Sequence, residues 1–198
     1  MKYGELNLGQ VEAIVNKLGG MDGVRRLLSG ESVVKMVEQT FAIWKTIKLG
    51  TGLKTADDFR KALKQSGYKI GNWANDILGK PAFATSEREM EIDLVVVSVA
   101  ELGFGEGARR GDIYERAISL GLELCPNEVG PQLRLQYKDQ PNGEWLRIAM
   151  EPISGSDGDL GIFGVGHRGS GLWLVGSDGD PDDFWCDDYR FVFVRPRK

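Results

Sequence analysis

The stretch from Thr85 to Val99, Thr-Ser-Glu-Arg-Glu-Met-Glu-Ile-Asp-Leu-Val-Val-Val-Ser-Val, decides the fold class of this chain. Its first five residues are polar and typical of a connection, whereas residues 92–99 are a β-branched run with the length of a buried strand. Patterns before this stretch are mainly helical, and patterns after it are mainly those of short strands. We therefore expect an α+β protein, with helices followed by a mainly antiparallel β-sheet or sandwich-like part.

The first segment before this stretch has the pattern of a helical hairpin, at residues 6–30. Asn7 is expected to cap the first helix, which Gly19-Gly20 would end because glycine adopts the left-handed conformation at low cost. Asp22 is then expected to cap a second short helix that ends at Gly30.

Residues 31–50 are ambiguous, and the pattern favours a helix first and then a strand from about Ala42 to Lys48. The clearest helix is at 55–66, because Thr55 caps it, Asp58 completes a capping box and Gly67 ends it. A further helix is expected at 72–78.

The part after the stretch is predicted to be rich in strands, with one helix at 112–120 that Asp112 caps. Residues 133–137 and 145–150 both alternate between apolar and polar side chains, and Asn142-Gly143 between them predicts a hairpin. Further strands are expected at 160–165, 171–175 and 189–194. The repeated Ser-Asp-Gly-Asp, at 156–159 and 177–180, has the spacing of hairpin turns.

Charge divides the chain at the same place. Residues 1–84 carry 13 Lys/Arg and 8 Asp/Glu, which gives +5, while residues 85–198 carry 12 and 21, which gives −9. We therefore divide the chain into a helical hairpin at 1–30, a mainly helical basic segment at 31–84 and a β-rich acidic segment at 85–198. The alternative is that residues 31–198 form one α+β domain.

The composition indicates a soluble, cytoplasmic protein. Apolar residues make up 41% and charged residues 27% of the 198 residues, so the chain can bury a core without disulfides. Its two cysteines, Cys125 and Cys186, form no CxxC pair and are expected to be reduced thiols. No run approaches the roughly 20 apolar residues that a membrane-spanning helix needs, and the N-terminus lacks the apolar run of a signal peptide.

Two strings resemble a group of uncharacterised bacterial proteins. They are Asn16-Lys-Leu-Gly-Gly-Met-Asp-Gly-Val-Arg-Arg-Leu-Leu-Ser-Gly-Glu31 and Gly121-Leu-Glu-Leu-Cys-Pro-Asn-Glu-Val-Gly-Pro-Gln-Leu-Arg-Leu-Gln-Tyr137. The resemblance implies a bacterial, cytoplasmic origin and covers most of the chain. It implies no activity, because the group has no assigned function.

The helices expected at 55–66 and 72–78 have the outline of a helix-turn-helix in a basic neighbourhood. The second helix carries asparagines suited to adenine edges but neither Arg nor Lys, so core packing is favoured over DNA reading. If nucleic acid binds there, the expected contacts are Lys54, Arg60, Lys61, Lys64, Lys69, Asn72 and Asn75.

Sites that need two histidines are excluded, because His167 is the only one. His167 is expected at an exposed hairpin tip, since it lies in the glycine-rich string Gly166-His-Arg-Gly-Ser-Gly171. No catalytic residues are identified, and no cofactor is expected. A polar and aromatic binding surface is predicted in the C-terminal third, from His167, Arg168, Trp173, Asp183 and Trp185.

The segment 178–188 is unusually acidic, and alternate carboxylates in it have the spacing that can converge on a calcium ion. The EF-hand pattern fails, however, at its glycine and closing-glutamate positions, so solvated turn aspartates are favoured. The candidate metal ligands are Asp178, Asp180 and Asp182.

Three functions follow from these patterns, in order of preference. The first is a non-enzymatic binding or interaction protein, most simply one with a protein partner. The second is a nucleic-acid-binding protein that uses the basic helices. The third is a hydrolase-like or metal-dependent enzyme that uses the acidic segment.

Overall fold

The computed structural model describes residues 7–32, 40–169 and 171–197, and the chain divides into two compact units, residues 1–39 and 40–198. The first unit contains α1 (Leu8–Lys17) and α2 (Gly20–Leu28), which pack against each other and confirm the helical hairpin. Asn7 caps α1 as expected, and Gln10 completes a capping box with it. The second helix begins at Gly20, so Asp22 lies in its first turn and the prediction that it caps the helix is wrong.

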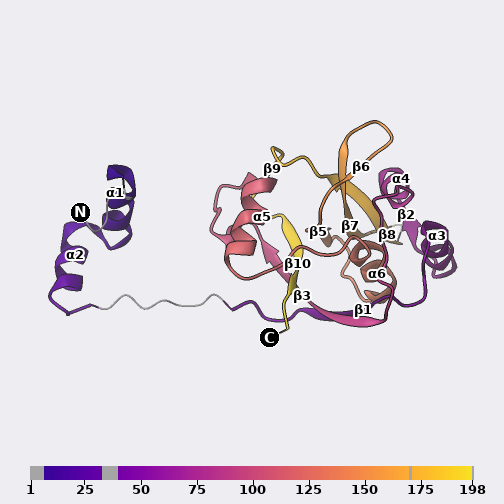
Figure 1. Ribbon diagram of the computed structural model, residues 1–198, viewed down its shortest axis with the longest axis horizontal. Helices are drawn as coiled ribbons and strands as arrows, with labels where there is room; N and C mark the ends of the chain where they lie inside the picture. The colour runs from indigo at the N-terminus through magenta and orange to yellow at the C-terminus, as the bar shows by residue number, and fades with distance from the viewer. Residues whose placement is uncertain (1–6, 33–39, 170, 198) are drawn as a thin grey trace. The chain divides into compact units, whose positions relative to one another are not determined.

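The second unit is built on a curled, mixed and mostly antiparallel sheet, so the α+β fold class is confirmed (Figure 1). In spatial order its strands are β1 (Lys45–Leu49), β3 (Met90–Ser98), β10 (Arg190–Arg195), β5 (Trp145–Ile148), β7 (Leu160–Arg168), β8 (Gly171–Asp178) and β2 (Lys69–Ile70), with β6 (Ile153–Ser154) paired to β7. The pairs β10–β5 and β2–β8 are parallel, and the others are antiparallel. A separate two-stranded ribbon joins β4 (Ala108–Arg109) to β9 (Phe184–Trp185).

Helices cover both faces of this sheet. They are α3 (Ala56–Gln65), α4 (Asn72–Leu78), α5 (Arg110–Ser119) and α6 (Val129–Gln136), with a 3-10 turn, η1 (Ala100–Leu102). Helix α6 contacts β1 at one edge of the sheet and β7 and β8 toward the other edge. The sheet therefore curls around α6 as a half-barrel, with α4 packed on β7 and β8 and with α3 on α6 (Figure 1).

Most of the predicted elements are present. The helices expected at 55–66 and 72–78 are α3 and α4, and the capping box of Thr55 and Asp58 forms. Strand β3 confirms the β-branched run, and the strands expected at 145–150, 160–165, 171–175 and 189–194 are β5, β7, β8 and β10. The first Ser-Asp-Gly-Asp, at 156–159, forms the turn between β6 and β7.

The strand predicted at 133–137 is wrong, because these residues lie mainly in α6. The alternation that suggested a strand comes from polar side chains that are not exposed. Arg134 and Gln132 are almost completely buried, as are Val129 and Leu133. A helix enclosed on all sides shows no amphipathic period, so its sequence cannot be recognised by periodicity.

The hairpin predicted across Asn142-Gly143 is therefore also wrong, and β5 pairs with β7 and β10 instead. Helix α5 begins at Arg110, so Asp112 does not cap it. The second Ser-Asp-Gly-Asp, at 177–180, ends β8 and leads into a loop rather than a hairpin turn. The helix predicted within 31–41 falls largely on residues 33–39, outside the described residues, and the following strand is β1.

Candidate functional site

The two faces of β7 and β8 have different surroundings. Glycines define the inner face, because a Cβ atom added at Gly161 or Gly176 would contact the Trp73 ring of α4, at 3.1 and 2.9 Å. Phe163 is also on this face, against Gly130 of α6. Because side chains alternate along a strand, residues 164, 166 and 168 of β7 and residues 173 and 175 of β8 belong to the outer face.

A row of side chains crosses the outer face on four strands. Trp145 of β5 pairs with Gly166 of β7, and Gly166 pairs with Trp173 of β8, which in turn pairs with Lys69 of β2. The Trp145 ring covers Gly166, since a Cβ added there would lie 2.4 Å from two of its ring atoms. The Lys69 ammonium lies 5.1 Å from the centroid of the Trp173 ring. The two indoles thus lie in one cross-strand row on either side of Gly166, and both are partly exposed.

Arg147 lies two residues beyond Trp145 on β5 and therefore on the same face. Its guanidinium carbon is 4.3 Å from the ring centroid of Tyr189 and 5.3 Å from that of Trp185. Burial lowers the pKa of Arg147, against the opposing effect of Tyr189 and Asp188, but a guanidinium stays charged in proteins. Among the described residues, no carboxylate forms an ion pair with it. Its charge is thus held in place by aromatic rings rather than neutralised.

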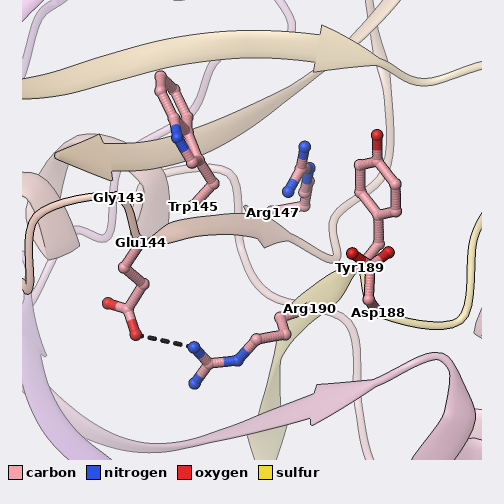
Figure 2. A pocket seen from close by; sticks show the side chains of 7 residues that line it. All are labelled: Gly143, Glu144, Trp145, Arg147, Asp188, Tyr189 and Arg190. Atoms are coloured by element: carbon pink, nitrogen blue, oxygen red, sulfur yellow. Dashed lines mark hydrogen bonds and ion pairs between the residues drawn. The ribbon is translucent and has the colours of Figure 1, made fainter. Parts of the chain in front are cut away.

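A shallow pocket of about 320 Å³ adjoins these side chains. Its lining residues are Gly143, Glu144, Trp145, Arg147, Asp188, Tyr189 and Arg190. Figure 2 shows Trp145, Arg147 and Tyr189 extending to one side of β5, while Glu144 and Arg190 extend to the other and form an ion pair at 2.9 Å. The ion pair and the aromatic side chains thus line different sides of the pocket.

The loop between α6 and β5 is anchored from the interior. The buried Arg134 donates to the Gln140 side chain and to the carbonyl of Tyr137, at the C-terminal end of α6, where a positive charge is favourable. The Tyr137 hydroxyl donates to Glu144 at 2.7 Å, and burial together with Glu144 raises the pKa of Tyr137. These contacts fix Glu144 and the beginning of β5, and so the position of Trp145.

His167 has a structural place in this anchor. It belongs to β7 rather than to the hairpin tip, because β7 and β8 remain paired as far as Arg168 and Gly171. Its Nδ1 lies 2.6 Å from the carbonyl oxygen of Gln140, which can only accept, so Nδ1 donates. His167 thus holds the same loop that Arg134 holds. The next residue, Arg168, is exposed on the outer face.

The acidic segment forms a loop against the start of α5. Asp178 accepts the backbone N–H of Asp180, Asp180 accepts that of Asp182, and Asp182 pairs with Arg109 at 2.8 Å. Within the part of the chain that the structure describes, no group of three or more His, Cys, Asp or Glu side chains is placed to hold a metal ion. A hydrogen bond with Asp178, followed by burial, raises the pKa of Asp183 to about 6.

Two residues of the basic helices, Arg60 and Asn75, hold the two helices together. Arg60 donates to the side chain and the carbonyl of Asn75, at 2.7 and 2.8 Å, and pairs with Asp57. The inner face of α4 is buried in the core, and Asn72 starts this helix at the surface. The exposed cations of the group are Lys54, Lys61 and Lys64 around α3, and Lys69 on the outer face of the sheet.

The structure thus brings together some of the residues predicted for ligand binding. Trp173 and Arg168 lie on the outer face, and Trp185 is buried beside Arg147. His167 supports the neighbouring loop, whereas Asp183 belongs to the loop against α5. Sequence reasoning missed Trp145, Arg147 and Tyr189. The alternation of Trp145-Leu-Arg-Ile148 was the available signal for two of them, since it places tryptophan and arginine on one face of a strand.

Comparisons with family models, with curated proteins and with solved structures found no match to this chain. Within the described ranges, 7–32, 40–169 and 171–197, no helix has the length and apolar character that crossing a membrane requires. The function must therefore be argued from the geometry of the chain's own residues.

Proposed function

We propose that residues 40–198 form a binding module whose ligand site is a surface on the outer face of the sheet, here called the outer-face patch. It consists of Lys69, Trp145, Arg147, Arg168, Trp173 and Tyr189. The observation that carries the proposal is the cross-strand row of Trp145 and Trp173 beside a guanidinium that pairs with no carboxylate of the described residues. Exposed aromatic surface on a rigid scaffold is typical of recognition sites.

The rigidity of the patch supports this role. Gly166 leaves room for the Trp145 ring to lie on β7, and Tyr189 and Trp185 hold Arg147 from the side. A site that is already ordered loses less conformational entropy when a ligand binds. The patch therefore has the preorganisation that a binding surface needs.

Two side chains of the types often used as nucleophile and base, Cys125 and His167, have structural roles instead, while the other cysteine, Cys186, is an exposed free thiol. The Cys125 thiol is buried and donates to the carbonyl of Val192 at 3.3 Å, and burial raises its pKa. A thiol in such surroundings is inert, because the thiolate is the reactive form. His167 is held by the Gln140 carbonyl. Both facts favour binding over catalysis.

A ligand screen tests the proposal. We expect compounds that combine a planar ring with a negative charge to raise the melting temperature of the full chain and to change its tryptophan fluorescence, because a ligand of the native state must stabilise it. The same compounds should leave the R147A variant unaffected. A screen in which no such compound shifts the melting temperature at millimolar concentration contradicts the proposal.

A further inference from the structure

We infer that the ligand of the outer-face patch is single-stranded nucleic acid, with its bases stacked on Trp145 and Trp173 and its phosphates paired with Lys69, Arg147 and Arg168. This inference rests on the proposed function and adds the class of ligand. Bases have the flat faces, and a phosphate backbone has the repeated negative charge, that such a surface complements.

The tryptophans have the arrangement of a stacking platform. Trp145 and Trp173 pair with the same residue, Gly166, from opposite sides, so their backbones are separated by two strand spacings, or about 10 Å. Among the rings of the described residues, neither indole has a ring–ring contact of the kind that joins Trp185 to Tyr189. A sheet surface of this kind stacks about two or three unpaired bases on its aromatic side chains.

The cations flank the indoles. Lys69 is at the Trp173 end of the row, Arg147 follows Trp145 along β5, and Arg168 follows Gly166 along β7. None of the three forms an ion pair with a described residue. The patch thus offers three positive charges, and of the two carboxylates that line the adjoining pocket, Glu144 is paired with Arg190 and Asp188 is exposed.

This local charge outweighs the net charge of −4 for the encounter with a polyanion, because exposed charges farther than about 10 Å are largely screened at 0.1 M salt. The acidic loop around Asp182 also has part of its charge neutralised by Arg109. A double helix fits the patch less well, since its bases are stacked inside and cannot reach the indoles. The chemistry therefore favours a single strand over a duplex.

Fluorescence anisotropy of labelled twelve-nucleotide strands, dT and rU, tests the inference with the full chain. We expect saturable binding at 50 mM salt, with quenching of tryptophan fluorescence and weaker binding of a duplex of equal length. Three phosphate contacts predict that log K falls against log salt with a slope of about −2, so that binding weakens roughly twentyfold between 50 and 200 mM salt.

Variants then locate the site. W173A should weaken binding about tenfold or more, and K69A/R168A should weaken it and reduce the salt slope to about −0.7, one contact. The matched variant K61A/K64A removes two exposed charges from α3 and should leave binding unchanged. Circular dichroism of each variant checks its fold, and K69A/R168A carries the test if W173A is unstable, since both cations are exposed.

Each contrary result has a definite meaning. Binding that K61A/K64A abolishes and K69A/R168A leaves intact would move the site to the basic helices and overturn the inference. The same holds for binding that no variant changes. If neither strand binds at 50 mM salt while another planar anion stabilises the chain through Arg147, the ligand class is wrong and the proposed binding function stands.

Discussion

Substitution of Gly166 by alanine tests the contact on which the outer-face patch depends. The added Cβ would lie 2.4 Å from two atoms of the Trp145 ring, whereas carbon atoms in van der Waals contact are about 3.5–4.0 Å apart. The ring must therefore move by more than 1 Å, and overpacking of this kind costs about 1–3 kcal/mol. Alanine recovers about 0.5–1 kcal/mol, since glycine loses more backbone freedom on folding. We expect a net loss of about 0.5–2 kcal/mol in the free energy of unfolding.

A double-mutant cycle with W145A isolates this clash. In the W145A background the ring is absent, so G166A should keep only the gain of about 0.5–1 kcal/mol, and the coupling between the two substitutions should equal the cost of the clash, about 1–3 kcal/mol. Urea unfolding followed by far-ultraviolet circular dichroism measures all four proteins, because removal of Trp145 alters the fluorescence. G169A is the control, since an added Cβ has no neighbour within 4 Å there. If G166A changed the free energy of unfolding equally with and without Trp145, the contact between the Trp145 ring and Gly166 of β7 would be refuted.

Three further substitutions test contacts outside the patch. The pKa of Asp183 is raised to about 6, so its protonation stabilises the folded state below about pH 4, and this contribution is lost as the pH rises through 6. The free energy of unfolding in urea should therefore be higher for D183N than for the wild type at pH 8 and equal for the two proteins at pH 4. Hydrogen bonds from Arg197 and, to a smaller extent, from Thr46 lower the pKa of Asp93 to about 2. The ionised Asp93 therefore stabilises the folded state above about pH 4, and this contribution is lost toward pH 2. R197A should have a lower free energy of unfolding than the wild type at pH 7, and the difference should shrink as the pH is lowered. The buried Glu128 accepts hydrogen bonds from Gly50, Ser86 and Gln132 at 2.9, 2.7 and 2.9 Å. E128Q places an NH₂ group opposite groups that are themselves donors, so it should lower the free energy of unfolding by about 2–4 kcal/mol. An unchanged urea midpoint would contradict this role.

Local signals in the sequence predict most of the fold correctly. Thr55 and Asp58 mark the start of α3 because a capping box satisfies backbone donors without help from the rest of the chain. The β-branched run likewise predicts β3, because a strand that lies between two others, here β1 and β10, is rich in such residues. Such elements are predictable because neighbouring residues determine them.

The failures occur where distant residues decide the structure. Helix α6 is enclosed by the curled sheet, and its buried polar residues bond to partners far away in the chain, as Gln132 does to Thr51. Hydrophobic periodicity arises because one face of a helix is exposed to water, and an enclosed helix has no exposed face. The pairing of β5 with β10 is likewise a parallel contact between segments about 45 residues apart, which no turn signal can reveal.

The outer-face patch proposed from the structure shares only part of its residues with the surface expected from the sequence, for the same reason. Trp173 and Arg168 came from the aromatic and polar composition of the C-terminal third, but composition cannot show which strand lies beside which. Trp145 joins them only because β7 stands between β5 and β8. Tyr189 contributes through its stacking on Arg147 and lies 42 residues beyond it in the sequence. A site assembled across strands requires the strand order.

The glycines of β7 and β8 give the sheet its different faces. Gly161 and Gly176 admit the Trp73 ring on the inner face, and Gly166 admits the Trp145 ring on the outer face. On the inner side the indole is part of the contact between α4 and the sheet, so it serves folding. On the outer side, the absence of a side chain at Gly166 lets the Trp145 indole lie on the strand, where it is partly exposed to water. Because α4 and α6 already cover the inner face, Trp145 on the outer face is not part of that contact, and the proposed binding function would give its indole a role.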